Sequence, residues 1–260
     1  MKPIKIAVND RITYFANNAD QEYWNALWAS QISPDFYAKY EGGMLDEYFP
    51  YFEQHLSKND RILEAGCGTG RYVVALLSRG YANIQGIDWG KSTIDKVKTI
   101  FPDLPIEVGD ATDVDVENNF YDAYISLGVV EHREAGPEPF LNEAFRILKP
   151  GGVALISVPY VNPIRNLKRN LGFYRNQVVT GFSFYQYAFQ ISEFASFLSA
   201  AGFHVLSTHG ISGVYGLKDE FPFLRFFINN LPGGWRMEKY LNKFQFLNKF
   251  GHMILFVCNK

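Results

Sequence analysis

A glycine-rich segment is the first candidate for a ligand-binding site. Its sequence is Glu64-Ala-Gly66-Cys-Gly68-Thr-Gly70-Arg71, after a short apolar stretch and before a helical pattern. Gly66 and Gly68 permit a tight turn and a close approach of backbone to a ligand. A dinucleotide-binding loop has a small residue where Arg71 stands, and Glu64 would repel a pyrophosphate. The loop therefore suits a cofactor that has an amino group and a positively charged sulfonium.

Two further carboxylates follow the next two predicted strands. Asp88 lies 22 residues after Gly66, where an acid can bind both hydroxyls of a ribose. Asp110 is placed to accept a hydrogen bond from an adenine amino group. Singly, Asp88 could cap a helix and Asp110 could stabilise a turn. Together with Glu64 they lie at successive strand ends, where sheets of this kind bind their ligands.

The elements that must position these acids alternate between strand and helix. The strands are expected at 61–65, 83–88, 105–108, 121–127, 153–158, 203–208 and 252–258. The helices are expected at 71–79, 91–101, 137–148 and 192–201. The alternation predicts a doubly wound α/β fold, with a mostly parallel sheet and helices on both faces.

Three segments lie outside this alternation. Residues 1–58 are predicted to form an N-terminal helical cap, and 59–260 the main domain. Within that domain, lid insertions are expected at 160–190 and 213–251. Helical spacing in the cap would gather Tyr23, Trp24, Leu27 and Trp28 on one face. This face either packs on the main domain or covers the ligand.

Composition limits the function classes. The formal net charge of -2 argues against a nucleic-acid binder held by bulk charge. The two cysteines, Cys67 and Cys258, make neither a disulfide framework nor a zinc site. No stretch approaches 18 apolar residues, and polar residues interrupt the start of the chain too early for a secretory leader. A cytoplasmic location is the expectation.

Residues 61–159 resemble the class I S-adenosylmethionine-dependent methyltransferases. The resemblance is strongest to the broad methyltransferase-domain group with an E-x-G-C-G-x-G loop. Its further motifs are Ser126-Leu-Gly-Val-Val-Glu131-His132, Leu148-Lys-Pro-Gly-Gly152 and the segment 185–205. With the last strand it covers about two thirds of the chain. It implies a seven-stranded sheet of order 3-2-1-4-5-7-6, with an antiparallel last strand at 252–258.

The resemblance implies S-adenosylmethionine as the cofactor and a binding site at the strand ends. Asp88 would bind the ribose, Trp89 would lie against adenine, and Asp110 would meet the adenine edge. Arg71 would either neutralise the cofactor carboxylate or be solvated. The residues expected to bind the cofactor are Glu64, Gly66, Cys67, Gly68, Gly70, Arg71, Asp88, Trp89, Asp110, Ala111 and Leu127.

Methyl transfer is an in-line displacement, so the protein mainly positions the acceptor and excludes water. His132, which follows the fourth strand, is the candidate general base for a hydroxyl acceptor. The alternative is that Glu131 and His132 are structural and pair with a neighbouring loop. Some similar quinone-biosynthesis methyltransferases bind a metal with a glutamate at the position of Gly128. The glycine here predicts no metal.

The insertions are expected to choose the acceptor. No Asp or Glu occurs from Ala144 to Ser192. The basic residues of that stretch are Arg146, Lys149, Arg165, Lys168, Arg169 and Arg175, with aromatic residues between them. Such a lid suits an acidic, glycan- or lipid-linked small molecule. The second insertion could extend the pocket or touch a membrane surface, and both could instead be additional core.

Other functions stay open at this point. One is a nicotinamide-dependent oxidoreductase, against which Glu64 and Arg71 count. Another is a non-catalytic protein that binds S-adenosylmethionine. A nucleic-acid methyltransferase is disfavoured because Leu127-Gly-Val-Val stands where amino-group DNA methylation uses an Asn/Asp-Pro-Pro-Tyr/Phe motif. The expected partner is a small-molecule acceptor without nucleic acid, and the sequence does not predict an oligomeric state.

Overall fold

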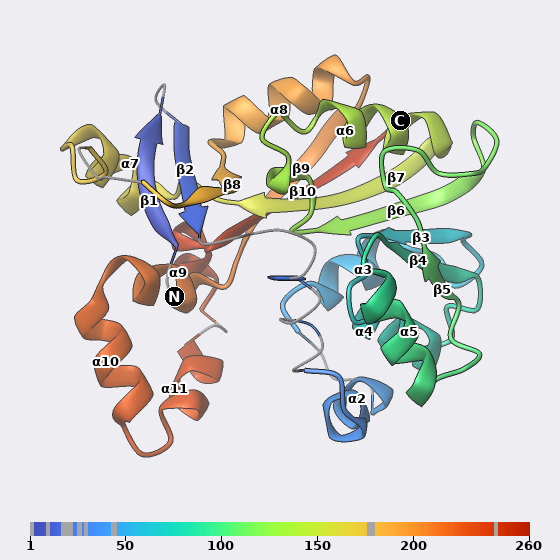
Figure 1. The fold of residues 1–260 in the computed structure, drawn as a ribbon, viewed down its shortest axis with the longest axis horizontal. Coiled ribbons are helices and arrows are strands. Elements are labelled where there is room, and N and C mark those ends of the chain that lie inside the picture. The colour runs from blue at the N-terminus through green and yellow to red at the C-terminus, as the bar shows by residue number, and fades with distance from the viewer. Residues whose placement is uncertain are drawn as a thin grey trace.

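A computed structural model describes residues 3–8, 11–16, 23–24, 28, 31–42, 46–175, 180–241 and 244–260. Its main feature is a seven-stranded sheet of order β5-β4-β3-β6-β7-β10-β9 (Figure 1). The strands are β3 (Ile62–Ala65), β4 (Ile84–Asp88), β5 (Ile106–Val108), β6 (Tyr121–Leu127), β7 (Leu148–Pro159), β9 (His204–Ile211) and β10 (Met253–Asn259). β10 pairs antiparallel with both of its neighbours. The predicted fold class, strand order and antiparallel last strand are confirmed.

Helices cover both faces of this sheet. The helices of one face are α2 (Pro34–Glu41), α3 (Phe49–His55), α4 (Arg71–Ser78) and α5 (Lys91–Ile100). Those of the other face are α6 (Glu138–Ile147) and α8 (Ile191–Ala200). Side chains alternate across a strand, so Ala123 and Ile125 of β6 join the first core and Tyr124 joins the second.

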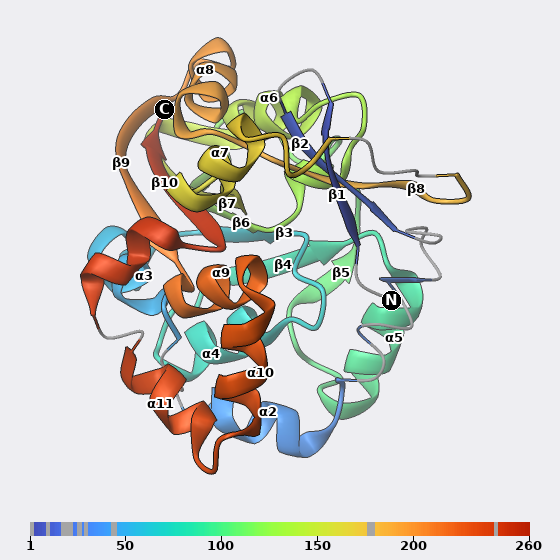
Figure 2. The ribbon, with the colours of Figure 1, turned by 90° about the vertical axis from the view of Figure 1, so that its left-hand side faces the viewer.

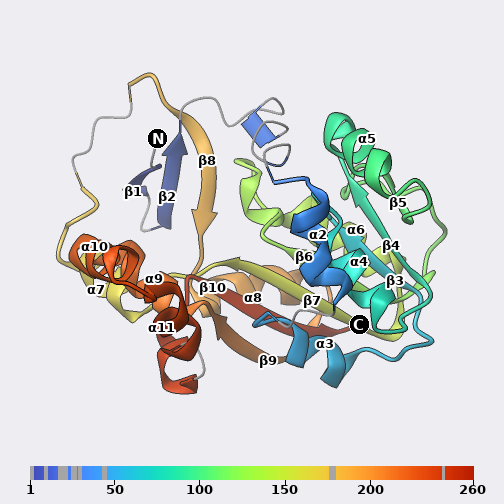
Figure 3. The ribbon, with the colours of Figure 1, turned by 90° about the horizontal axis from the view of Figure 1, so that it is seen from below.

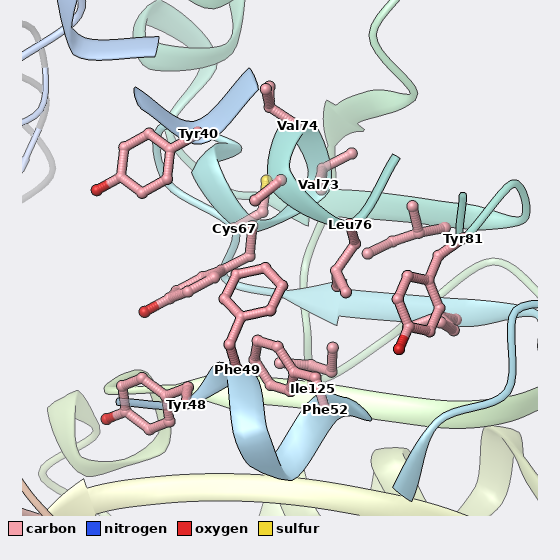
Figure 4. Packing of buried hydrophobic residues seen from close by; sticks show 14 of the residues in the cluster. Tyr40, Tyr48, Phe49, Phe52, Cys67, Val73, Val74, Leu76, Tyr81 and Ile125 are labelled. Carbon is pink, nitrogen blue, oxygen red and sulfur yellow. The ribbon is translucent and has the colours of Figure 1, made fainter. Parts of the chain in front are cut away.

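Aromatic packing fills the first core. Phe49 and Phe52 of α3 lie between Leu76 of α4 and Ile125 of the sheet (Figure 4). Both phenylalanine side chains are fully buried. Burial of a phenylalanine side chain is favourable by roughly 1.5–3 kcal/mol. The N-terminal part of the chain therefore anchors the helix that follows the glycine loop.

A second, three-stranded sheet stands beside the large one (Figure 3). Its antiparallel strands are β1 (Ile4–Val8), β2 (Arg11–Ala16) and β8 (Ser183–Ala188). The prediction of a helical cap is therefore wrong for residues 4–16. β2 pairs with a strand of the first insertion, Ile12 opposite Ala188, and that partner lies far away in the sequence. The proposed boundary at residue 58 stays a prediction.

The insertions contain regular structure. The first holds α7 (Pro163–Asn170) and β8. The second holds α9 (Gly213–Glu220), α10 (Pro222–Asn230), α11 (Gly234–Leu241) and the 3-10 helix η2 (Gln245–Phe250). Figure 2 shows α9, α10 and α11 grouped below α7. Within the described ranges, no helix has the length and apolar character needed to cross a bilayer.

A buried ion cluster joins these added elements. Arg165 of α7 is fully buried, and its guanidinium lies 3.0 Å from Asp219 and 3.1 Å from Glu220, both on α9. Lys5 of β1 reaches the same two carboxylates at 2.5 Å. Arg165 also donates to the carbonyl of Tyr160 at the end of β7. The cluster therefore fastens β1 and both insertions to the large sheet.

Four of the six cations of the basic stretch have carboxylate partners within the protein. Lys168 pairs with Glu220 at 3.1 Å, and Arg165 belongs to the buried cluster. Arg146 and Lys149 form ion pairs of 2.7 and 2.6 Å with Glu143 and Asp122. The acidic partners of these four cations lie outside the stretch, and an acidic acceptor for the lid stays a prediction. Arg169 donates to an asparagine of its own helix.

We expect Arg165→Met to destabilise the protein by about 3–5 kcal/mol, because Asp219 and Glu220 would lose a buried partner. Urea unfolding followed by circular dichroism measures the change. The matched control is Lys91→Met, which removes an exposed ion pair with Asp95 and should change the unfolding free energy little. Equal, small effects of both substitutions would contradict a stabilising role for the cluster.

Candidate active site

The glycine loop takes a backbone conformation that other residues rarely adopt. Gly66 and Gly68 have φ angles of +78° and +52°. A Cβ atom at Gly66 would lie 2.3 Å from a methyl carbon of Val129, so the loop and the segment after β6 touch closely. The amides of Gly66 and Cys67 donate to the carbonyl of Ile87 at 2.8 and 2.9 Å. These contacts fix the loop over the ends of β3 and β4.

Asp88, the last residue of β4, holds the loop with both carboxylate oxygens. One accepts from the amide of Gly68 and the other from the amide of Gly90, each at 2.8 Å. Burial raises the pKa of Asp88, while the two amides act in the opposite direction. Asp88 therefore joins the glycine loop to the start of α5, and its binding of a ribose stays a prediction.

A cavity of about 560 Å³ opens beside this carboxylate. Its walls include the predicted residues Gly66, Asp88, Trp89, Asp110, Ala111 and His132. Asp110 is exposed and accepts hydrogen bonds from the amide and hydroxyl of Thr112 at 2.8 and 2.7 Å. Its carboxylate thus shapes the turn after β5 and also lines the cavity. The turn interpretation of Asp110 is confirmed, and its contact with adenine stays a prediction.

The other predicted cofactor residues lie within or behind the loop. Gly70 begins α4 with a φ of +67°, and Arg71 lies with its guanidinium 4.7 Å from the centre of the Tyr72 ring. Cys67 is buried, and burial raises the pKa of its thiol. Leu127 is the last residue of β6. None of these residues is among those that line the cavity, and their contacts with the cofactor stay predictions.

Glu64 is a buried carboxyl group behind the loop. Its Oε2 atom has no hydrogen-bond partner among the described residues. Burial raises its pKa to about 8, so the group is largely protonated at neutral pH. A buried polar atom without a partner is costly. An ammonium group, water or amide brought to this point by a ligand would satisfy it, which fits the cofactor expected from the sequence.

Two tryptophans close the cavity from the N-terminal side. Trp24 and Trp28 line it, and their rings stack with centroids 6.1 Å apart. Trp28 lies over the glycine loop, 3.4 Å from the position that a Cβ atom of Gly68 would take. This aromatic face packs on His132 and Tyr185 and also lines the cavity, and its covering of a ligand stays a prediction. Leu27, predicted for the same face, is outside the described residues.

Some cavity residues were not predicted. They are Val108, Gly109, Thr112, Gly128, Val129, Arg133 and Phe140. Most of them directly follow a strand end or adjoin a predicted residue. This closeness in sequence is the feature from which they could have been predicted. Phe140 is different, because it lies on α6 and only the packing of that helix brings it to the cavity.

His132 is held in one orientation. Its Nδ1 atom lies 2.7 Å from the carbonyl oxygen of Tyr185 on β8. A carbonyl only accepts, so Nδ1 carries the proton and Nε2 keeps a lone pair. The ring of Trp24 lies 4.6 Å away, centre to centre. Burial lowers the pKa of His132 to about 4, and the hydrogen bond to the Tyr185 carbonyl raises it by a smaller amount. A neutral imidazole therefore borders the cavity.

Glu131 lies behind this imidazole. Its Oε1 atom is 3.8 Å from Nε2 of His132, and Oε2 has no hydrogen-bond partner among the described residues. Burial raises the pKa of Glu131 to about 8. The pair is therefore neutral rather than ionic near pH 7. Within the described part of the chain, no three His, Cys, Asp or Glu side chains are grouped to hold a metal ion.

Comparison with known proteins agrees with this geometry. The sequence model of the family described as "Methyltransferase domain" matches residues 63–156. The chain contains a class I S-adenosylmethionine-dependent methyltransferase domain. The match covers the glycine loop, Asp88, Asp110 and His132.

Individual relatives share about half of their length with this chain. A Mycolicibacterium smegmatis protein, named a probable S-adenosylmethionine-dependent methyltransferase, is 29% identical over 161 residues, covering 61% of this chain and 57% of that protein. A ubiquinone/menaquinone biosynthesis C-methyltransferase of Neisseria meningitidis is 28% identical, covering 42% and 47%. Among solved structures, the methyltransferase in complex with the Trm112 activator of Haloferax volcanii has a TM-score of 0.61 at 17% identity, covering 94% and 97%. That likeness shows the fold alone.

The imidazole of His132 should titrate near pH 4 in the folded protein rather than near its usual 6.5. Between these values the unfolded chain binds more protons, so this group makes the folded state less stable as the pH falls from 6.5 towards 4. Nitrogen-15 NMR of the ring measures the pKa and the tautomer, with His132→Asn assigning the signal. Titration near or above 6.5 would show that Glu131 is ionised and stabilises the imidazolium.

Proposed function

We propose that this protein is an S-adenosylmethionine-dependent methyltransferase that acts on a small molecule. The observation that carries the proposal is one cavity bordered by both the Asp88 carboxylate and the neutral His132. The Asp88 carboxylate is suited to hold a nucleoside, and the neutral His132 is suited to accept a proton. A non-catalytic binding protein would not need the second group.

The cofactor site would use residues at the ends of four strands, β3, β4, β5 and β6. Asp88 is the acceptor for the ribose hydroxyls, and the indole of Trp89, which is 55% exposed, offers a flat face to adenine. Asp110 and the amide of Ala111 meet the adenine edge. The ammonium group is held by the backbone carbonyl of Leu127. Cys67 and both flanking glycines contact the methionine part through the backbone, and Glu64 acts from behind the loop.

S-adenosylmethionine, when bound, supplies a methyl group on a positively charged sulfur. The chain then has to orient the acceptor and keep water out. Trp24 and Trp28 cover the cavity, and Nε2 of His132 accepts the hydrogen bond of an acceptor hydroxyl. Nε2 would take the proton of that hydroxyl when its oxygen receives the methyl group, whose bond to the cofactor sulfur breaks with its electron pair left on the sulfur. The Tyr185 carbonyl stabilises the resulting imidazolium through Nδ1.

The acceptor is expected to have a flat or lipid-like apolar part. Trp24, Trp28 and Phe140 line the cavity. The cation on its wall is Arg133, so an acidic group of the acceptor would bind there. Two relatives are named for quinone or hydroquinone molecules: the Neisseria meningitidis protein and a rice 2-methyl-6-phytyl-1,4-hydroquinone methyltransferase. A zebrafish relative is named as an eEF1A lysine methyltransferase, so protein acceptors form the second candidate class.

Asp88→Asn should weaken binding of S-adenosylmethionine by about 10- to 100-fold, because a hydrogen bond to a charged group contributes roughly 1.5–3 kcal/mol. Isothermal titration calorimetry measures the dissociation constant. Asp95→Asn, an exposed change on α5, is the matched control and should bind normally. If NADH bound to the wild type and S-adenosylmethionine did not, the oxidoreductase interpretation would replace this one.

His132→Asn should lower the rate of methyl transfer to a hydroxyl acceptor by about 10²- to 10⁴-fold without changing cofactor affinity. The amide nitrogen of asparagine can still donate to the Tyr185 carbonyl, but the lone pair of Nε2 is lost. The assay follows a labelled methyl group into small-molecule extracts, quinols and purified protein fractions. His204→Asn on the exposed side of β9 is the control.

The possible outcomes separate the candidate functions. Label in the quinol or small-molecule fraction supports the proposal, and label confined to protein overturns the acceptor class. Cofactor binding without label in any fraction would indicate a non-catalytic protein. An unchanged rate in His132→Asn would show that the acceptor atom needs no base.

A further inference from the structure

The second insertion exposes a large apolar surface. Of the sixteen large apolar side chains that are exposed among the described residues, eight lie between residues 223 and 246. We call this the α10–α11 surface. Its most exposed members are Phe223, Phe226, Phe227, Tyr240 and Phe246, each at least 58% exposed. Exposed apolar groups that are clustered rather than scattered mark interaction sites.

The arrangement of α10 explains why these side chains face outwards. Phe223, Phe226 and Phe227 fall at positions i, i+3 and i+4, so they share one face of the helix. Ile228 is the buried residue of α10, which packs against both α9 and α11. The helix thus has both buried and exposed apolar side chains. Figure 1 shows α10 and α11 at the edge of the molecule, below the N-terminal sheet.

The same segment is basic in an acidic chain. Residues 222–250 contain five basic residues, Arg225, Arg236, Lys239, Lys243 and Lys249, and one acidic residue, Glu238. Glu238 forms an ion pair of 2.7 Å with Lys218 of α9. The whole chain has a formal net charge of -2. The segment that carries the exposed aromatic side chains is therefore basic in its sequence.

Short helices with exposed aromatic residues and adjacent basic residues suit an anionic lipid surface. The apolar face enters the headgroup boundary, and the basic side chains meet lipid phosphates. A second copy of this chain would fit less well, because two identical basic surfaces would repel each other. We propose that the α10–α11 surface docks the protein peripherally on a bilayer that contains anionic lipids.

The proposal does not depend on the identity of the methyl acceptor. The surface lies on the second insertion, whereas the cavity is lined by residues up to Phe140. A lipid-soluble acceptor would be met at such a surface, but docking is tested without it. Cofactor binding should be unchanged by substitutions on the surface, which distinguishes loss of docking from loss of the proposed activity.

The test is co-sedimentation of the full chain with vesicles of phosphatidylcholine alone or mixed with phosphatidylglycerol, at low and high salt. We expect binding to the mixed vesicles only, weakened by salt. For the double variant Phe226→Ser/Phe227→Ser we expect an affinity for the mixed vesicles that is lower by about tenfold or more. The control is Leu206→Ser, which removes an exposed apolar side chain on β9. Thermal unfolding and cofactor titration establish that each variant is folded.

Three results would overturn the proposal. The first is no binding of the wild-type chain to mixed vesicles at low salt. The second is equal binding by the double variant and the wild type. The third is a dimer in analytical ultracentrifugation that becomes a monomer in the double variant, without vesicle binding, which would assign the surface to a second copy of the chain.

Discussion

The structure depends on a buried guanidinium. Removing Arg165 from water is unfavourable, and the fold meets this cost by giving each of its N–H groups an acceptor. Those acceptors come from α9, from the end of β7 and from His252 before β10. Because Lys5 of β1 shares the two α9 carboxylates, the first strand of the chain is held by the same interaction. Segments that are far apart in sequence become one supporting structure.

That support reaches the candidate active site through β8. β8 pairs with β2, and its Tyr185 carbonyl fixes the tautomer of His132. The ring of Tyr185 also stacks with Trp24, with the planes 14° apart. The second sheet thus orients the proposed base and supports one of the tryptophans that cover the cavity. The orientation of His132, which follows β6, therefore depends on Tyr185, more than 50 residues later in the chain.

The carboxyl groups around the cavity differ in what stabilises them. Asp88 accepts two backbone amides, which favour its charged form. Glu64 and Glu131 each have one oxygen without a partner among the described residues, and burial raises both pKa values to about 8. Residue type alone could not show this difference, because it depends on burial and on neighbouring donors. Burial raises the pKa of Glu131 and lowers that of His132, which explains why His132 stays neutral beside a glutamate.

The sequence by itself determined the large sheet and the edge at which ligands bind. Its apolar periods are local, so β3, β4, β5 and β6 end at the predicted residues, whereas β7 begins five residues earlier and β9 ends three residues later than predicted. Only tertiary structure decided the rest. β2 is a strand because it pairs with β1 and with β8, and four cations of the basic stretch are paired with carboxylates that lie outside that stretch. Such long-range pairing leaves no periodic pattern in the chain, since each partner is satisfied only after folding.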